Sequence, residues 1–253
     1  MTAVPPAPHS AALRPRIGFP PDQTAILLDF DGTLVDIAPT PESVVVPPGL
    51  RETLLTLRER CGGALAVVTG RPIEQIDHFL PGVPTAVCGE HGIAIRRHPG
   101  APIERAPLPE VPQAWRDEAE KIVRGWPGAS VEPKRAGFVL HYRGAPDAQE
   151  PLREAAEGWL AGDDSFEIQA AKMAWEIRPS GVDKGHAVEA LLEQAPFAGR
   201  KPLFVGDDVT DNDGIRAARA AGGVGFRIPD DFPTAQAFRD WLKHYSEAPQ
   251  WDV

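Results

Sequence analysis

The chain has 253 residues, of which 42% are hydrophobic and 25% are charged, the proportions of an ordinary globular protein of one or two domains. Its formal net charge is -10, which opposes binding to nucleic acid or to anionic membranes, because both are held mainly by Lys and Arg. The two cysteines, Cys61 and Cys88, have no clustered partners and fit a reducing compartment, so we expect a cytoplasmic monomer that acts on a small molecule.

Residues 1–23 contain six prolines and no apolar stretch long enough for a signal peptide or a membrane span. We therefore expect a flexible tail here.

Four elements follow, in which strands and helices alternate. The expected strands are short apolar runs, and the expected helices have leucines on one face or follow a Gly-Pro turn. In chain order they are a strand at 25–30, a helix at 48–61, a strand at 64–69 and a helix from about 73.

The middle of the chain has a different texture. Helical patterns at 113–124 and 147–160 are each followed by two strand-like segments, at 129–133 and 137–143 and then at 166–170 and 173–178. Two such units predict a small antiparallel sheet with helices on one face.

The alternating pattern then returns, with a helix at 183–194, a strand at 202–205, a helix at 211–221 and a strand at 223–228. Alternation of this kind predicts an α/β fold, a Rossmann-like parallel sheet with helices on both faces. We assign this core to 24–106 and 180–253, and an inserted α+β cap domain to 107–179.

Acidic residues follow two of the predicted core strands. Asp29 and Asp31 end the first, and Asp207, Asp208 and Asp211 follow Gly206 at the end of the 202–205 strand. Because parallel strands end at the same edge of a sheet, these carboxylates should converge there and repel one another unless a cation is bound. Oxygen ligands favour a hard cation, Mg²⁺ before Ca²⁺. The second cluster could equally be a turn that caps a helix, a role compatible with metal binding.

Two further features suit a phosphate group. Thr69, Gly70 and Arg71 end a strand and offer a hydroxyl and backbone N–H groups beside a helix start. Lys184 lies near another helix start, where a cation is unusual. Together these residues predict phosphoryl transfer to Asp29, with Lys184 neutralising charge and Asp31 acting as acid and base.

The four motifs DFDGT (29–33), VVTGR (67–71), Lys184 and GDDVTD (206–211) resemble those of haloacid dehalogenase-like hydrolases in order and spacing. The resemblance implies that Asp29 is the nucleophile, Asp31 the acid/base, and Thr69 and Lys184 phosphate ligands. It also implies that Asp29, Asp207 and the backbone carbonyl of Asp31 bind Mg²⁺, with Asp208 and Asp211 in or beside the metal shell.

A finer resemblance is to trehalose-6-phosphate phosphatases. It is carried by the segments GEHG (89–92), HYR (141–143) and KMAWEIRP (172–179) together with GDDVTD. It implies that the cap holds the sugar of a sugar phosphate, through Lys172 and Glu176 and through the weaker candidates Glu132, Lys134, His141 and Arg143. On spacing alone Lys172 and Glu176 would be one exposed face of a strand.

Other functions remain open at this stage. The same core motifs would suit phosphatases of sucrose phosphate or mannosyl-phosphoglycerate, and a phosphomutase shares the aspartyl-phosphate step. A sugar-phosphate sensor without catalysis is a further alternative, although it would not need both Asp29 and Asp31.

Overall fold

The computed structural model describes residues 15–134 and 136–251. The chain divides into two compact units. One consists of Met1–Ile103 with Lys184–Val253, here called the core unit, and the other of Glu104–Asp183, here called the inserted unit.

The core unit is built on a seven-stranded sheet with the order β11-β10-β1-β2-β3-β4-β5, whose edge strand β5 consists of the first two residues of the inserted unit. The five strands from β11 to β3 run parallel, and β4 is antiparallel to β3. The strands are β1 (Thr24–Leu28), β2 (Leu65–Val68), β3 (Ala86–Gly89), β4 (Ala94–Arg96), β5 (Glu104–Arg105), β10 (Lys201–Gly206) and β11 (Val224–Arg227).

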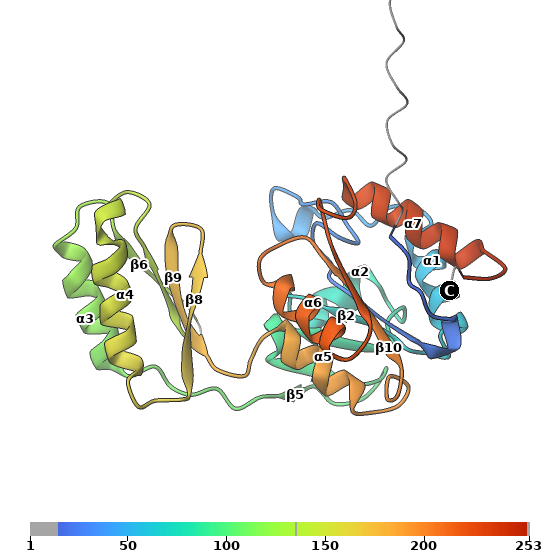
Figure 1. Cartoon of the computed structure of the whole chain (residues 1–253), viewed down its shortest axis with the longest axis horizontal. Helices are drawn as coiled ribbons and strands as arrows, with labels where there is room; N and C mark the ends of the chain where they lie inside the picture. The colour runs from blue at the N-terminus through green and yellow to red at the C-terminus, as the bar shows by residue number, and fades with distance from the viewer. Residues whose placement is uncertain (1–14, 135, 252–253) are drawn as a thin grey trace, which may run out of the picture. The chain divides into compact units, whose positions relative to one another are not determined.

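Helices cover this sheet on both faces. In Figure 1, α1 and α7 lie together on one side, and α5 and α6 lie together on the other. The helices of the core unit are α1 (Leu50–Arg60), α2 (Ile73–Phe79), α5 (Lys184–Leu192), α6 (Asp211–Ala220) and α7 (Ala235–Glu247). The predicted α/β core is thereby confirmed. Among the described residues, every helix is too short or too polar to cross a membrane.

The buried core explains why the strands are so apolar. All five residues of β1 are buried, because a central parallel strand is covered on both faces. None of its side chains faces solvent, so the strand has no alternation of apolar and polar residues. On α1 the buried residues are Leu50, Leu54 and Leu57, a spacing that places them on one face of the helix.

The segment before β1 is packed where the structure describes it. Residues 1–14 of the expected tail lie outside the described residues. From 15 onward the chain belongs to the core unit, since Ile17 is 1% exposed and the Trp241 indole donates a hydrogen bond to the Pro15 carbonyl at 2.8 Å. The tail assignment therefore does not hold for 15–23, because α7, which the sequence analysis did not predict, supplies a surface for this segment.

The inserted unit contains two α-β-β repeats, as the sequence predicts. Its strands form an antiparallel sheet with the order β6-β7-β9-β8, and α3 and α4 cover one face (Figure 1). Phe138, Leu140 and Ile177 pack toward the helices in one hydrophobic cluster. The elements are α3 (Gln113–Arg124), β6 (Ser130–Pro133), β7 (Phe138–His141), α4 (Gln149–Leu160), β8 (Phe166–Ala171) and β9 (Ala174–Pro179).

Candidate active site

The carboxyl ends of β1, β2 and β10 meet at one edge of the core sheet. Pairing of β1 with both neighbours brings the loops that follow these strands together, and Asp29 N donates a hydrogen bond to the Val205 carbonyl at 2.9 Å. A cavity of about 520 Å³ opens at this edge. Its lining includes Asp29, Asp31, Thr69, Gly70, Arg71, His91, Lys184, Asp207 and Asp208.

Lys184 connects the two acidic loops. Its Nζ lies 2.7 Å from Asp29 Oδ1 and 2.6 Å from Asp211 Oδ1, and its side chain is only 3% exposed. Burial alone would lower the pKa of Lys184, but the Asp29 and Asp211 carboxylates raise it above its ordinary value. The lysine is therefore a fixed positive charge beside the Asp29 carboxylate.

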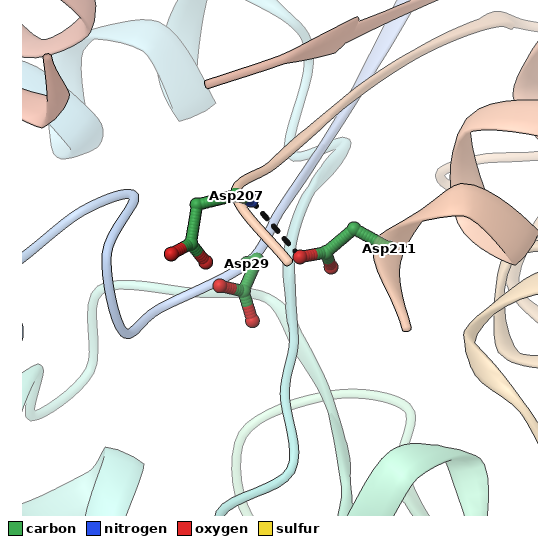
Figure 2. A group of neighbouring side chains, drawn as sticks. All are labelled: Asp29, Asp207 and Asp211. Carbon is green, nitrogen blue, oxygen red and sulfur yellow. Dashed lines mark hydrogen bonds between the residues drawn. The ribbon is translucent and has the colours of Figure 1, made fainter. Parts of the chain in front are cut away.

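Asp29, Asp207 and Asp211 form the group that could hold a metal ion (Figure 2). One oxygen from each lies within 4.8 Å of the others, which suits ligands around one cation. Asp211 is already engaged, because its Oδ2 accepts the backbone N–H groups of Asp207 and Asp208 at 3.0 Å each. The donor set is entirely carboxylate oxygen, so it fits a hard divalent cation.

Two glycines allow this crowding. A Cβ on Gly32 would lie 2.0 Å from Asp207 Oδ2, and Gly32 also has a left-handed φ of 71°. A Cβ on Gly206 would lie 2.1 Å from Asp211 Cγ. The glycines of DFDGT and GDDVTD therefore make room for the carboxylates of the metal group.

Burial makes two of these carboxylates reluctant to ionise without a cation. Burial raises the pKa of Asp29 to about 8, with Lys184 opposing the shift and Asp211 adding to it. Burial and the charges of Asp211 and Asp208 raise the pKa of Asp207 to about 6. Protons and a cation should thus compete for the same oxygens.

Asp31 is held by an arginine. Arg71 Nε and Nη2 donate to the two carboxylate oxygens of Asp31 at 2.6 and 2.7 Å, a bidentate pair. Arg71 Nη1 is in turn fixed by Gln75 Oε1 at 2.8 Å and the Pro41 carbonyl at 2.9 Å, and the guanidinium lies over the rings of Phe30 and Phe79. The sequence suggested Arg71 as a substrate ligand, whereas the structure places its guanidinium on Asp31.

The remaining core residues also lie at the cavity. Thr69, which is 1% exposed, and Gly70 line it beside the start of α2. Asp208 is not part of the metal group. Its Oδ1 accepts both the backbone N–H and the hydroxyl of Thr210 at 2.6 Å, so it holds the loop before α6, whereas the alternative interpretation of this motif had Thr210 or Asp211 as the helix cap.

Two of the polar candidates of the inserted unit, Glu132 and Glu176, lie on the sheet face opposite its helices. Register pairs Glu132 with Val139 and Val139 with Glu176, so Glu132 and Glu176 share this open face. Glu132 accepts a hydrogen bond from Lys134 and contacts His141 Nε2 at 2.9 Å. The three residues were weaker candidates from the sequence, but their contacts were not predicted, because His141 reaches Glu132 only through the pairing of β6 with β7.

Lys172 and Arg143 lie outside the strands. Lys172 occupies the two-residue turn between β8 and β9, followed by Met173 with a left-handed φ of 58°. The alternation argument for Lys172 and Glu176 therefore fails, because alternation does not continue through a turn. Arg143 follows β7 and is exposed.

Comparisons with known proteins agree with this geometry. A family model described as trehalose-phosphatase matches residues 27–239. The chain is 41% identical over 218 residues to a probable trehalose-phosphate phosphatase of Sinorhizobium fredii, covering 85% of this chain and 82% of that one. It is 34% identical over 205 residues to trehalose-6-phosphate phosphatase of Escherichia coli, covering 81% and 77%.

The chain belongs to the trehalose-phosphatase family. The solved structure of Aspergillus fumigatus trehalose-6-phosphate phosphatase has the same fold, with a TM-score of 0.66 and 23% identity over 88% of this chain and 93% of that one. A haloacid dehalogenase-like hydrolase from Bacteroides thetaiotaomicron superimposes with a TM-score of 0.56 and 16% identity over 86% and 99%. The recognition of the trehalose-phosphatase family from the sequence is confirmed, and the fold is the one that the haloacid dehalogenase-like resemblance implies.

The raised pKa values of Asp29 and Asp207 predict how stability responds to pH and to metal. Between the ordinary value of 3.8 and the folded values of about 8 and about 6, the folded protein holds more protons than the unfolded chain. The melting temperature of metal-free protein should therefore fall as the pH rises from 6 to 8, and Mg²⁺ should raise it more at pH 8 than at pH 6.

Thermal melting in EDTA and in Mg²⁺ across this pH range measures both effects. Asp29→Asn is the matched variant, and it should flatten the pH dependence in EDTA because the amide does not titrate. Identical Mg²⁺ effects at both pH values would show that protons and metal do not compete at these carboxylates.

Proposed function

We propose that this chain hydrolyses trehalose 6-phosphate to trehalose and phosphate through a phosphoryl group carried by Asp29. The observation that supports this most directly is the Asp29 carboxylate held against the buried Lys184 ammonium at the carboxyl edge of the sheet, with Asp31 beside it. Membership in the trehalose-phosphatase family supports the choice of substrate.

In the first step an Asp29 carboxylate oxygen attacks phosphorus in line, and the bond between phosphorus and the sugar oxygen breaks. Asp31 protonates the departing sugar oxygen, so trehalose leaves as a neutral alcohol. Lys184 stands beside Asp29 with a full positive charge, where it offsets the negative charge of the transferring group together with the Thr69 hydroxyl and backbone N–H groups at Gly70.

In the second step a water molecule attacks the phosphorus of the aspartyl phosphate. Asp31, now ionised, takes a proton from that water, and the bond between phosphorus and the Asp29 oxygen breaks to give inorganic phosphate. The cycle leaves both aspartates as they began. A single carboxyl group therefore serves as acid and then as base, a role typically worth roughly 10²–10⁴ in rate.

We propose Mg²⁺ as the cofactor, because an all-oxygen carboxylate group suits a hard cation. Asp29, Asp207 and the backbone carbonyl of Asp31 would bind it, with Asp208 and Asp211 alongside. When bound, the cation supplies charge neutralisation for the phosphoryl group and for the carboxylates around it.

The function predicts Mg²⁺-dependent phosphate release from trehalose 6-phosphate that disappears in Asp29→Asn. The amide is nearly the same size as the carboxylate but is no nucleophile, so turnover should fall by at least about 10³-fold. The measurement is phosphate release from purified protein in Mg²⁺ and in EDTA, with folding checked by circular dichroism.

Sucrose phosphate and glucose 6-phosphate should be poor substrates in the same assay. A preference for either over trehalose 6-phosphate would contradict the substrate assignment but not the phosphatase chemistry, whereas full activity in EDTA would contradict the metal assignment alone.

We propose further that Arg71 acts through Asp31 and not mainly as a substrate ligand. The bidentate contact and the anchors at Gln75 and Pro41 give the Asp31 carboxyl a fixed orientation. An ester with a poor leaving group depends on protonation by that carboxyl, but p-nitrophenolate leaves without being protonated.

Arg71→Ala should therefore lower kcat/KM for trehalose 6-phosphate by roughly 10–100-fold and for p-nitrophenyl phosphate only a few-fold. This ratio kcat/KM reports the steps up to phosphoryl transfer, so the leaving-group comparison isolates the role of the acid. Gln75→Ala, which removes one anchor of Arg71, should give a smaller loss with the same substrate pattern. Equal losses on both esters would identify Arg71 as a phosphate ligand.

We also propose that the inserted unit is a specificity cap that binds the sugar. Its open sheet face offers carboxylate acceptors at Glu132 and Glu176, and Lys172 adds a donor on the adjoining turn. Recognition of a polyol requires such a mixture of donors and acceptors. Binding energy from the part of the sugar that does not react would then help to position the phosphate.

Lys172→Ala and Glu176→Ala should each lower kcat/KM for trehalose 6-phosphate by roughly 10–100-fold, and p-nitrophenyl phosphate should be affected little. Lys121→Ala and Glu120→Ala make the same changes at exposed positions of α3 in the same unit and should have no effect. Equal losses on the two esters would mean that the substitutions damage the unit as a whole.

A further inference from the structure

The turn after β3 has a strained backbone. Glu90 and His91 are consecutive residues with left-handed φ values of 52° and 59°. Glycine adopts this backbone conformation readily and Asn and Asp less so, whereas other residues adopt it rarely. Residues held in this conformation are strained and gather at functional sites. The neighbouring Gly89 and Gly92 show that glycine occurs in this turn, yet positions 90 and 91 carry large side chains.

Backbone hydrogen bonds join this turn to residues 69–71, the loop expected to bind a phosphate group and here called the phosphate cradle. Glu90 N donates to the Arg71 carbonyl and His91 N donates to the Thr69 carbonyl, both at 3.0 Å. Backbone hydrogen bonds therefore fix the position of His91 relative to Thr69, Gly70 and Arg71, although His91 follows β3 and the other three residues follow β2.

The imidazole lies directly against the cradle. A Cβ on Gly70 would be 2.5 Å from His91 Nε2 and 2.6 Å from its Cε1, so the ring occupies the space beside the Gly70 backbone. His91 is nevertheless an exposed residue and lines the cavity with Asp29, Thr69 and Lys184. A ring that is exposed to the cavity and held against the cradle can reach a group bound there.

The side chains that line the cavity carry more negative than positive charge, which favours a further hydrogen-bond donor for a bound phosphate. The lining contains the carboxylates of Asp29, Asp31, Asp207 and Asp208, whereas its cations are Lys184, which is bound to two aspartates, and Arg71, which is bound to Asp31. A phosphate ester brings further negative charge. An additional hydrogen-bond donor at the cradle would stabilise it.

Resting on the proposed phosphatase function, we propose that His91 is a binding residue for the phosphoryl group, and that the strained turn exists to hold its imidazole at Gly70. The contact concerns the part shared by all phosphate esters. Its loss should therefore weaken every phosphate ligand, unlike changes at Lys172 or Glu176.

His91→Gly tests the proposal, because it removes the ring and suits the left-handed backbone. We expect kcat/KM to fall by roughly 10–100-fold for trehalose 6-phosphate and p-nitrophenyl phosphate alike, and the dissociation constant for inorganic phosphate to rise by a similar factor. The melting temperature should stay level or rise by up to about 2–4 °C as the strain is relieved.

Glu90→Gly is the matched control, since it relieves the same conformation in the same turn and leaves the imidazole in place. It should retain wild-type kinetics and phosphate binding. A loss confined to trehalose 6-phosphate would place His91 on the sugar, and a lowered melting temperature with unchanged phosphate binding would make it a structural support. Either result would overturn the proposal.

Calorimetric titration with inorganic phosphate in Mg²⁺ separates this proposal from the proposed function. A wild-type protein that binds phosphate but hydrolyses no ester would contradict the phosphatase assignment, and His91→Gly would still report on the binding role. A wild-type enzyme that hydrolyses trehalose 6-phosphate, with His91→Gly equally active, would refute the role of His91 alone.

Discussion

The buried ammonium of Lys184 is the interaction on which the site depends. Asp29, after β1, and Asp211, at the start of α6, both carry carboxylates into a region with almost no solvent, and each would be strongly destabilising if left unpaired. Lys184, at the start of α5, contacts both. Asp211 in turn binds the backbone of Asp207 and Asp208. One lysine thus holds three separate segments of the chain in a single arrangement.

Much of this arrangement could be predicted from the sequence because it follows from sheet topology. Apolar runs without polar alternation indicate central parallel strands, and such strands end at a common edge. Register confirms it, since Leu28 of β1 pairs with Val205 of β10 one residue before Asp29 and two before Asp207. The convergence of two acidic loops therefore needs only the strand assignments and no knowledge of side-chain contacts.

The features that could not be predicted depend on contacts distant in sequence. Nothing near Arg71 indicates that its guanidinium binds Asp31, 40 residues earlier, or that Glu132 meets His141 across a strand pair. The helix α7 is different, because Phe238, Trp241, Leu242 and Tyr245 have the spacing of one buried face, and they are buried. That signal is present in the sequence, and the packing of residues 15–23 follows from it.

The use of glycine distinguishes two kinds of tight position around the cavity. At Gly32 and Gly206 another side chain must occupy the space where a Cβ would be, so the absence of a side chain is what the carboxylates require. At Glu90 and His91 the backbone has the conformation that glycine favours, yet side chains are present. The two positions differ in what their side chains reach, because the His91 ring lies against Gly70 and lines the cavity, whereas Glu90 is not among the cavity-lining residues. The proposed role of the imidazole therefore concerns His91 and not the strained backbone as such.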